Sequence, residues 1–85
     1  MIGETSLISR HIYVDGHRTS VRLEAVFWET LRAIARRQNV SVHHLVSVIN
    51  RNRIRSSLTS AIRIYVVTYL IAQAPTEGLP SHLFR

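Results

Sequence analysis

The sequence contains no cysteine and no lysine, and it has no apolar run long enough to span a bilayer. Without cysteine, the chain forms neither disulfides nor thiolate zinc sites. The longest apolar stretch, Ile64–Ala72, is interrupted by Thr68 and is far too short for a membrane helix. Met1–Ser9 has no basic start followed by an apolar run, so we expect no signal peptide. These absences predict a soluble, cytoplasmic protein without a membrane partner.

Patterns typical of catalysis are also missing. We find no Ser-His-Asp order, no glycine-rich phosphate loop and no carboxylate pair, so we expect neither an enzyme nor a cofactor. The pair His43-His44 does not predict a metal site, because adjacent residues on a helix point about 100° apart. With 85 residues the chain forms one domain with a modest core. A partner subunit is therefore the expected additional source of stability.

The charge balance indicates the class of partner. Net charge is +6, all eleven basic residues are arginine, and no acidic residue lies between Thr30 and Thr76. Such a field attracts polyanions, and arginine binds phosphate and guanine edges with two parallel hydrogen bonds. Nucleic acid is the favoured partner. An anionic membrane surface, an acidic protein or a merely solvated arginine surface are the alternatives.

A β-hairpin is predicted near the N-terminus, after a frayed segment of residues 1–9. His11–Val14 is rich in strand-forming residues, and Asp15-Gly16 is a strong signal for a two-residue turn. The segment 18–23 alternates, which predicts a half-buried strand. Its inner face would be Thr19, Val21 and Leu23, and its polar, cationic outer face would be Arg18, Ser20 and Arg22.

Three helices are predicted after the hairpin. The first, at about 25–38, has an apolar stripe and is followed by Asn39, which suits a left-handed C-terminal position. Ser41 is a good N-cap for a second helix that ends near Asn52, and Ser57 for a third at about 58–73. The expected core residues of the three helices are Phe27, Trp28, Leu31, Ile34 and Ala35; Val42, Leu45, Val46 and Ile49; and Leu58, Ala61, Ile62, Tyr65, Val66 and Tyr69.

The third helix is apolar on more than one side. Ile64, Val67 and Ile71 lie off its expected core face. A helix with two apolar faces is usually buried on both. In so small a domain, the second face is expected to be a subunit interface. Residues 74–85 would form a short tail without periodicity.

The strand predicted at 18–23 also requires a partner, since a lone strand leaves its backbone groups unpaired. Pairing with the same strand of a second chain would give a two-stranded ribbon, which fits the major groove of B-DNA. In that arrangement Arg18, Ser20 and Arg22 of both chains would face the bases.

Three segments resemble a bacterial subfamily of ribbon-helix-helix proteins. They are Gly16–Glu24, Phe27-Trp28 and Ser57–Val66, which match its Gly-His-Arg-Thr-Ser strand, Leu-Glu…Phe-Trp helix and Leu-Ser-Ser-Ala-Leu-Arg segment. The resemblance covers roughly residues 10–72. It implies a mainly α fold over residues 10–73, in which one short strand pairs across a homodimer above two or three helices.

The same resemblance implies a transcriptional regulator that binds double-stranded DNA at the nucleoid. It assigns base contacts to Arg18, Ser20 and Arg22, and phosphate contact to a helix start, either at Ser41 or at Ser57. The full expected set of phosphate contacts is His17, Ser41, His43, Arg51, Arg53, Arg55 and Ser57. For Arg51, Arg53 and Arg55, the sequence is equally consistent with phosphate contact and with a solvated surface that contributes only to solubility.

The sequence allows two arrangements of residues 11–14 in the dimer. If His11–Val14 folds back as a strand, the dimer has a four-stranded sheet, too wide for a groove of about 12 Å. Either that segment moves aside or the protein engages DNA differently.

The alternative functions are an antitoxin-like module, which would bind a protein through Leu79, Leu83 and Phe84 in its tail, and a non-specific architectural DNA binder.

Overall fold

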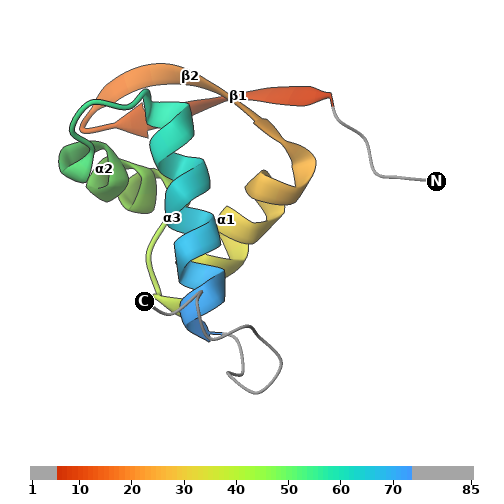
Figure 1. Cartoon of the computed structure of the whole chain (residues 1–85). Helices are drawn as coiled ribbons and strands as arrows, with labels where there is room; N and C mark the ends of the chain where they lie inside the picture. Colours follow the sequence, from red (N-terminus) through yellow and green to blue (C-terminus); the bar gives the residue numbers. More distant parts are fainter. Residues whose placement is uncertain (1–5, 74–85) are drawn as a thin grey trace.

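The computed structural model describes residues 6–73, which form one hairpin and three helices. Figure 1 shows the hairpin lying across one end of the helices. The elements in chain order are β1 (Leu7–Val14), β2 (His17–Glu24), α1 (Ala25–Arg37), α2 (Val42–Asn52) and α3 (Leu58–Gln73). This confirms a mainly α fold with a short ribbon. None of the helices in residues 6–73 has the length and apolarity needed to cross a membrane.

The hairpin turns at Asp15-Gly16, where both residues have positive φ angles of 50° and 85°. A two-residue turn of this kind matches the natural twist of the paired strands. β1 and β2 are antiparallel and pair from Val14 opposite His17 to Leu7 opposite Glu24. His11–Val14, whose arrangement the sequence left open, therefore belongs to a second strand, and each chain has two strands rather than the one short strand that the family resemblance implied.

β1 begins earlier than we expected. Residues 1–9 were expected to lie outside the domain as a frayed segment, but residues 7–9 belong to the strand. Ile8 lies opposite Leu23 and packs against the core, and its carbonyl accepts a hydrogen bond of 2.8 Å from Trp28 Nε1. These contacts hold the start of β1 on the helices. Residues 1–5 are not among those that the structure describes.

The core lies between the inner face of the hairpin and the helices. Val21 and Leu23 are buried as their alternation predicted, together with Ile12 and Val14 of β1. From the helices, the buried residues are Trp28, Leu31, Ile34, Ala35, Leu45, Val46, Ile49, Ile62 and Val66. The other predicted core residues of the helices are partly buried and pack against this core: Phe27, Val42, Leu58, Ala61, Tyr65 and Tyr69.

The helix ends also follow the sequence. Asn39 adopts a positive φ of 61°, the left-handed conformation that ends a helix. The Ser41 hydroxyl accepts the backbone N–H of His44 at 3.0 Å, and the Ser57 hydroxyl accepts that of Ser60 at 3.1 Å. Both predicted caps are present, so α2 and α3 are separate helices.

α3 exposes part of its apolar surface. Ile64, Val67 and Leu70 are all exposed, while Ile71 is half-buried. On its other side, α3 is joined to the end of β2 by an ion pair between Arg63 and Glu24 at 2.9 Å. The helix is therefore fixed relative to the hairpin, and its exposed side has no cover within residues 6–73.

Candidate nucleic-acid interface

The outward face of the hairpin is polar and cationic. Arg18, Ser20 and Arg22 of β2 are all exposed, as predicted, and lie opposite Tyr13, His11 and Ser9 of β1. Arg18 donates from Nη2 to His11 Nδ1 at 3.2 Å, because a guanidinium only donates. The Ser9 and Ser20 hydroxyls are 3.0 Å apart. Arg22 has no hydrogen bond or ion pair to any residue that the structure describes, so its guanidinium is free for a ligand.

The outer edge of β1 is covered by α2 at the end next to the turn. His43 Nδ1 accepts the backbone N–H of Tyr13 at 3.0 Å. The Ser47 hydroxyl donates to the Tyr13 carbonyl at 3.4 Å and accepts the N–H of Asp15 at 2.9 Å. Backbone groups that would otherwise attract another strand are therefore occupied by side chains of α2.

The outer edge of β2 is open. Because Tyr13 directs its backbone groups toward α2, the pair Tyr13–Arg18 is a non-hydrogen-bonded pair. Hydrogen-bonded and non-hydrogen-bonded pairs alternate along an antiparallel ladder. The pairs that contain Ser20 and Arg22, two and four residues after Arg18, are therefore also non-hydrogen-bonded. The backbone groups of these three β2 residues point away from β1, toward an edge that no strand within residues 6–73 occupies.

The two candidate helix starts differ in their surroundings. The start of α2 lies against β1, where the rings of His43 and Tyr13 have centroids 5.7 Å apart. Ser57 follows the connection that carries Arg53 and Arg55, and its hydroxyl also bonds to the hydroxyl of Ser60 at 3.1 Å. The structure thus brings His43, two residues after the cap Ser41, beside the hairpin.

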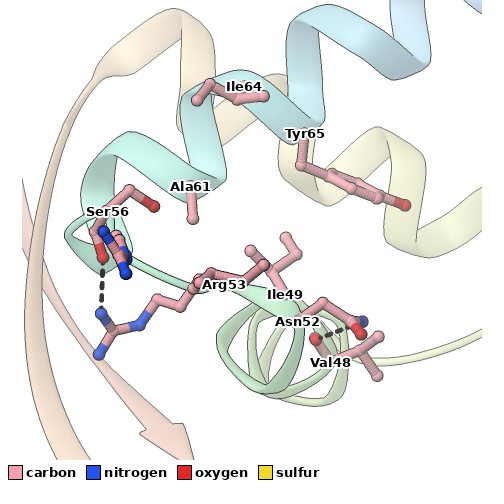
Figure 2. Close-up of a pocket in the computed structure, with 10 residues that line it drawn as sticks. Val48, Ile49, Asn52, Arg53, Ser56, Ala61, Ile64 and Tyr65 are labelled. Carbon is pink, nitrogen blue, oxygen red and sulfur yellow. Dashed lines mark hydrogen bonds between the residues drawn. The ribbon is translucent and has the colours of Figure 1, made fainter.

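Two of the expected phosphate-binding arginines already have partners. Arg51 donates twice to Asp15 Oδ1, at 2.9 and 3.1 Å, which ties the end of α2 to the hairpin turn. Arg53 donates to Asn50 Oδ1 at 2.7 Å. It also donates to the Ser56 carbonyl at 2.7 Å (Figure 2), and so stabilises the connection between α2 and α3.

Arg55 and His17 are in a different position. Both are exposed, and neither side chain has a hydrogen bond or ion pair among the residues described. Among the expected phosphate-binding residues, these are the two whose side chains have no partner within residues 6–73. Sequence reasoning could not separate Arg55 from Arg51 and Arg53, since their partners lie on other elements or depend on the local turn.

Most arginines lack a compensating carboxylate. Within residues 6–73 the ion pairs are Arg51–Asp15 and Arg63–Glu24. The pKa of Glu24 is lowered by a hydrogen bond from its own backbone N–H and by Arg63, which together outweigh the opposing effect of burial. The arginines of this range without an ion pair are Arg10, Arg18, Arg22, Arg32, Arg36, Arg37, Arg53 and Arg55. The molecule therefore has a strong excess of available positive charge.

Sequence reasoning missed Arg10 and Arg32. Arg10 lies opposite Val21, on the inner face by alternation, but it is exposed and its guanidinium lies 5.7 Å from the centroid of the Trp28 ring. Arg32 lies on the next turn of the same helix as Trp28, and both arginines line a cleft beside the start of α2. Because Arg10 lies on β1 and Arg32 on α1, no local pattern in the sequence connects the two residues.

An apolar groove lies between α2 and α3. It has a volume of about 390 Å³ and is lined by Val48 and Ile49 from α2 and by Ala61, Ile64 and Tyr65 from α3 (Figure 2). Ile54 at its rim is 89% exposed. Within residues 6–73, no group of three or more histidine, aspartate or glutamate side chains is suited to a metal ion. The groove thus suits apolar contact rather than a metal.

A cationic hairpin on a helical base is an arrangement that β-ribbon DNA-binding proteins use. The sequence matches the ribbon-helix-helix domain over residues 7–70, and the chain belongs to this family. The matched range includes β1 and most of α3, so the third helix is part of the domain. Members of the family are in general DNA-binding proteins and not enzymes.

A solved structure has the same architecture. It is that of an uncharacterized protein from Bordetella pertussis Tohama I, which is 28% identical in sequence and superposes with a TM-score of 0.64. The alignment covers 89% of this chain and 73% of that protein. A comparison with curated proteins finds no match.

Proposed function

We propose that the protein binds a specific site on double-stranded DNA as a homodimer and regulates transcription in the cytoplasm. The observation that supports this best is the placement of Arg18, Ser20 and Arg22 together on the exposed face of β2, beside the open edge of that strand. Arginine in the major groove reads guanine with two hydrogen bonds, and serine adapts to any base. Membership of the ribbon-helix-helix family agrees with this function.

Two surfaces support a homodimer. The open edge of β2 pairs with the β2 of a second copy, which satisfies the free backbone groups. The exposed apolar residues of α3 and the rim residue Ile54 provide a second surface that water solvates poorly. Covering both surfaces would supply stability that a domain of this size needs.

The hairpin determines how the dimer engages DNA. Pairing through β2 gives the strand order β1-β2-β2-β1, with outer strands about 14 Å apart at the usual spacing of about 4.8 Å. A groove of about 12 Å admits only the two central strands. Because β1 is held by Trp28, His43 and Ser47, we infer that it stays in place and lies over the sugar-phosphate backbone.

This arrangement also favours α2 as the helix whose start is near phosphate. His43 contacts β1, which would lie over the backbone, and Ser41 caps the same helix two residues earlier. His17 and Arg55 are exposed and available for further phosphate contacts. Arg51, Arg53 and Ser57 contribute mainly through the internal hydrogen bonds described above.

The test compares Arg22→Ala with Arg55→Ala on two DNA targets. Selection of bound genomic fragments first supplies the preferred site, and random DNA is the second target. Arg22→Ala should weaken binding to the preferred site by about 1–3 kcal/mol per contact and affect random DNA much less. Arg55→Ala should weaken both targets about equally.

Two results would contradict the proposal. If Arg22→Ala keeps the full preference for the selected site, the outward face of β2 is not the reading element. If footprinting shows uniform protection without a discrete site, the protein is a non-specific architectural binder. The antitoxin-like alternative depends on Leu79, Leu83 and Phe84, which lie outside the described residues.

A further inference from the structure

A second cleft lies on the outer side of β1. It has a volume of about 460 Å³ and lies between β1, the middle of α1 and the start of α2. Its polar lining comes mainly from Arg10, His11, Arg32 and His43, above a floor that includes Trp28. We call it the β1–α2 cleft. None of the functions assigned above uses Arg10, Arg32 or His11.

The β1–α2 cleft offers hydrogen-bond donors and positive charge. His43 Nδ1 accepts the N–H of Tyr13, so in the neutral ring the proton is on Nε2. His11 Nδ1 accepts from Arg18, which places its proton on Nε2 as well. Arg10 and Arg32 add two guanidinium groups, which only donate. The chemistry of this lining therefore suits an anion with several acceptor oxygens.

Among the residues that the structure describes, no carboxylate neutralises these groups. The lining contains no aspartate or glutamate. Asp15 and Glu24 are paired with Arg51 and Arg63, and Glu29 on α1 has no ion pair with Arg32. Arg10 is already positioned, because its guanidinium lies 5.7 Å from the centroid of the Trp28 ring.

We propose that the β1–α2 cleft binds a phosphodiester group of the DNA backbone, with Arg10 and Arg32 as its principal ligands. This inference rests on the proposed function and extends it to a site that reads no base. Arginine and phosphate form short, charge-assisted hydrogen bonds, commonly in pairs. The cleft accounts for two arginines that otherwise have no carboxylate partner within residues 6–73.

The position of the cleft agrees with this ligand. In the dimer proposed above, the β1 axis lies about 7 Å from the two-fold axis, which is one and a half strand spacings. The half-width of the major groove is about 6 Å, so β1 lies above the groove wall. The cleft lies beyond β1 on the α2 side, where the sugar-phosphate backbone passes.

The test measures DNA affinity against salt for Arg10→Gln, Arg32→Gln and the double variant. Each lost phosphate contact lowers the magnitude of the log–log slope by about 0.9, so losing one contact in each of two clefts lowers it by about 2. The preferred site and random DNA should lose affinity by the same factor, unlike the result expected for Arg22→Ala. Arg37→Gln, an exposed arginine at the end of α1 outside the cleft, is the matched control.

Two further measurements keep the result interpretable. Thermal unfolding shows that each variant folds, and Arg32→Gln alone suffices if the loss of the Arg10–Trp28 contact destabilises the other variants. Titration with inorganic phosphate, followed by the fluorescence of Trp28, tests for binding of the free anion. Trp28 is the only tryptophan in the sequence, so its signal is unambiguous.

The outcomes separate this inference from the proposed function. If the wild type binds DNA and the double variant keeps the slope and affinity of Arg37→Gln, the inference is wrong and the proposed function stands. If the wild type binds no DNA, both are wrong. In that case a saturable phosphate signal in Trp28 would identify the cleft as a site for free phosphate. A slope reduced by about 2 with unchanged site preference supports the inference.

Discussion

Replacing Ile64 by alanine should weaken the proposed homodimer without removing a buried core residue of the protomer. A fully buried isoleucine contributes about 1.5–3 kcal/mol relative to an exposed one. Ile64 is 62% exposed in the single chain, so covering it in a dimer contributes about 1–2 kcal/mol per copy. Since a two-fold interface contains two copies, the loss is about 2–4 kcal/mol, which raises the dimer dissociation constant by about 30- to 1,000-fold.

Sedimentation velocity over a range of protein concentrations measures this constant directly. The matched control is Ile64→Leu, which keeps the apolar area and should dimerise like the wild type. The thermal midpoint of the wild type should also fall on hundredfold dilution, because dissociation is coupled to unfolding. The reasoning is refuted if Ile64→Ala dimerises as tightly as the wild type, or if the wild type sediments as a monomer.

Three further predictions concern the salt dependence of DNA affinity, the pH dependence of stability and the hydrogen bonds from Ser47 to the hairpin. DNA affinity should fall with salt with a log–log slope of about −5 to −9, as expected for neutralising six to ten phosphates, and a slope near zero in filter binding would exclude a phosphate-dominated interface. Because folding lowers the pKa of Glu24 from its ordinary 4.5, its ionised form stabilises the protein above that pH, and this stability is lost as pH falls through the lower folded pKa. Thermal unfolding between pH 3 and 7 should therefore show a weaker acid dependence for Glu24→Gln, and identical profiles would contradict the role of Glu24. Ser47→Ala removes a buried hydroxyl that bonds to Asp15 and Tyr13, which should lower the free energy of unfolding by about 1–3 kcal/mol in urea titrations; no change would mean that α2 does not hold the hairpin.

Local patterns in the sequence predicted most of the fold. Alternation identified Val21 and Leu23 as core, and helical spacing placed Trp28 and Ile62 correctly. Asn39 and the two serine caps depend only on near neighbours, so they could be predicted as well. The strand face of Arg18, Ser20 and Arg22 followed from the same alternation.

Features that depend on distant residues could not be predicted. The start of β1 combines Leu7 and Ile8 with polar neighbours, and only its pairing with β2 and its contact with Trp28 make it a strand. The β1–α2 cleft joins Arg10 to Arg32 across two elements.

The ion-pair and hydrogen-bond partners of individual arginines could not be predicted, for the same reason. The bond from Arg51 to Asp15 joins residues that are 36 positions apart. A cluster of arginines in the sequence therefore does not reveal which of them are free. The structure separates Arg22 and Arg55 from Arg51 and Arg53, and this separation determines which variants are informative.

The unequal edges of the hairpin limit how many copies can assemble through strands. His43 and Ser47 occupy the outward backbone groups of Tyr13, at the turn end of β1, while no strand or side chain within residues 6–73 occupies the edge of β2. A sheet with two open edges adds copies without end, as in fibrils. In the dimer proposed above, the open edge of β2 is used when two copies meet, and near the turn the new outer edges are occupied by side chains of α2. At this end of the hairpin, α2 therefore opposes the addition of a third chain through β1.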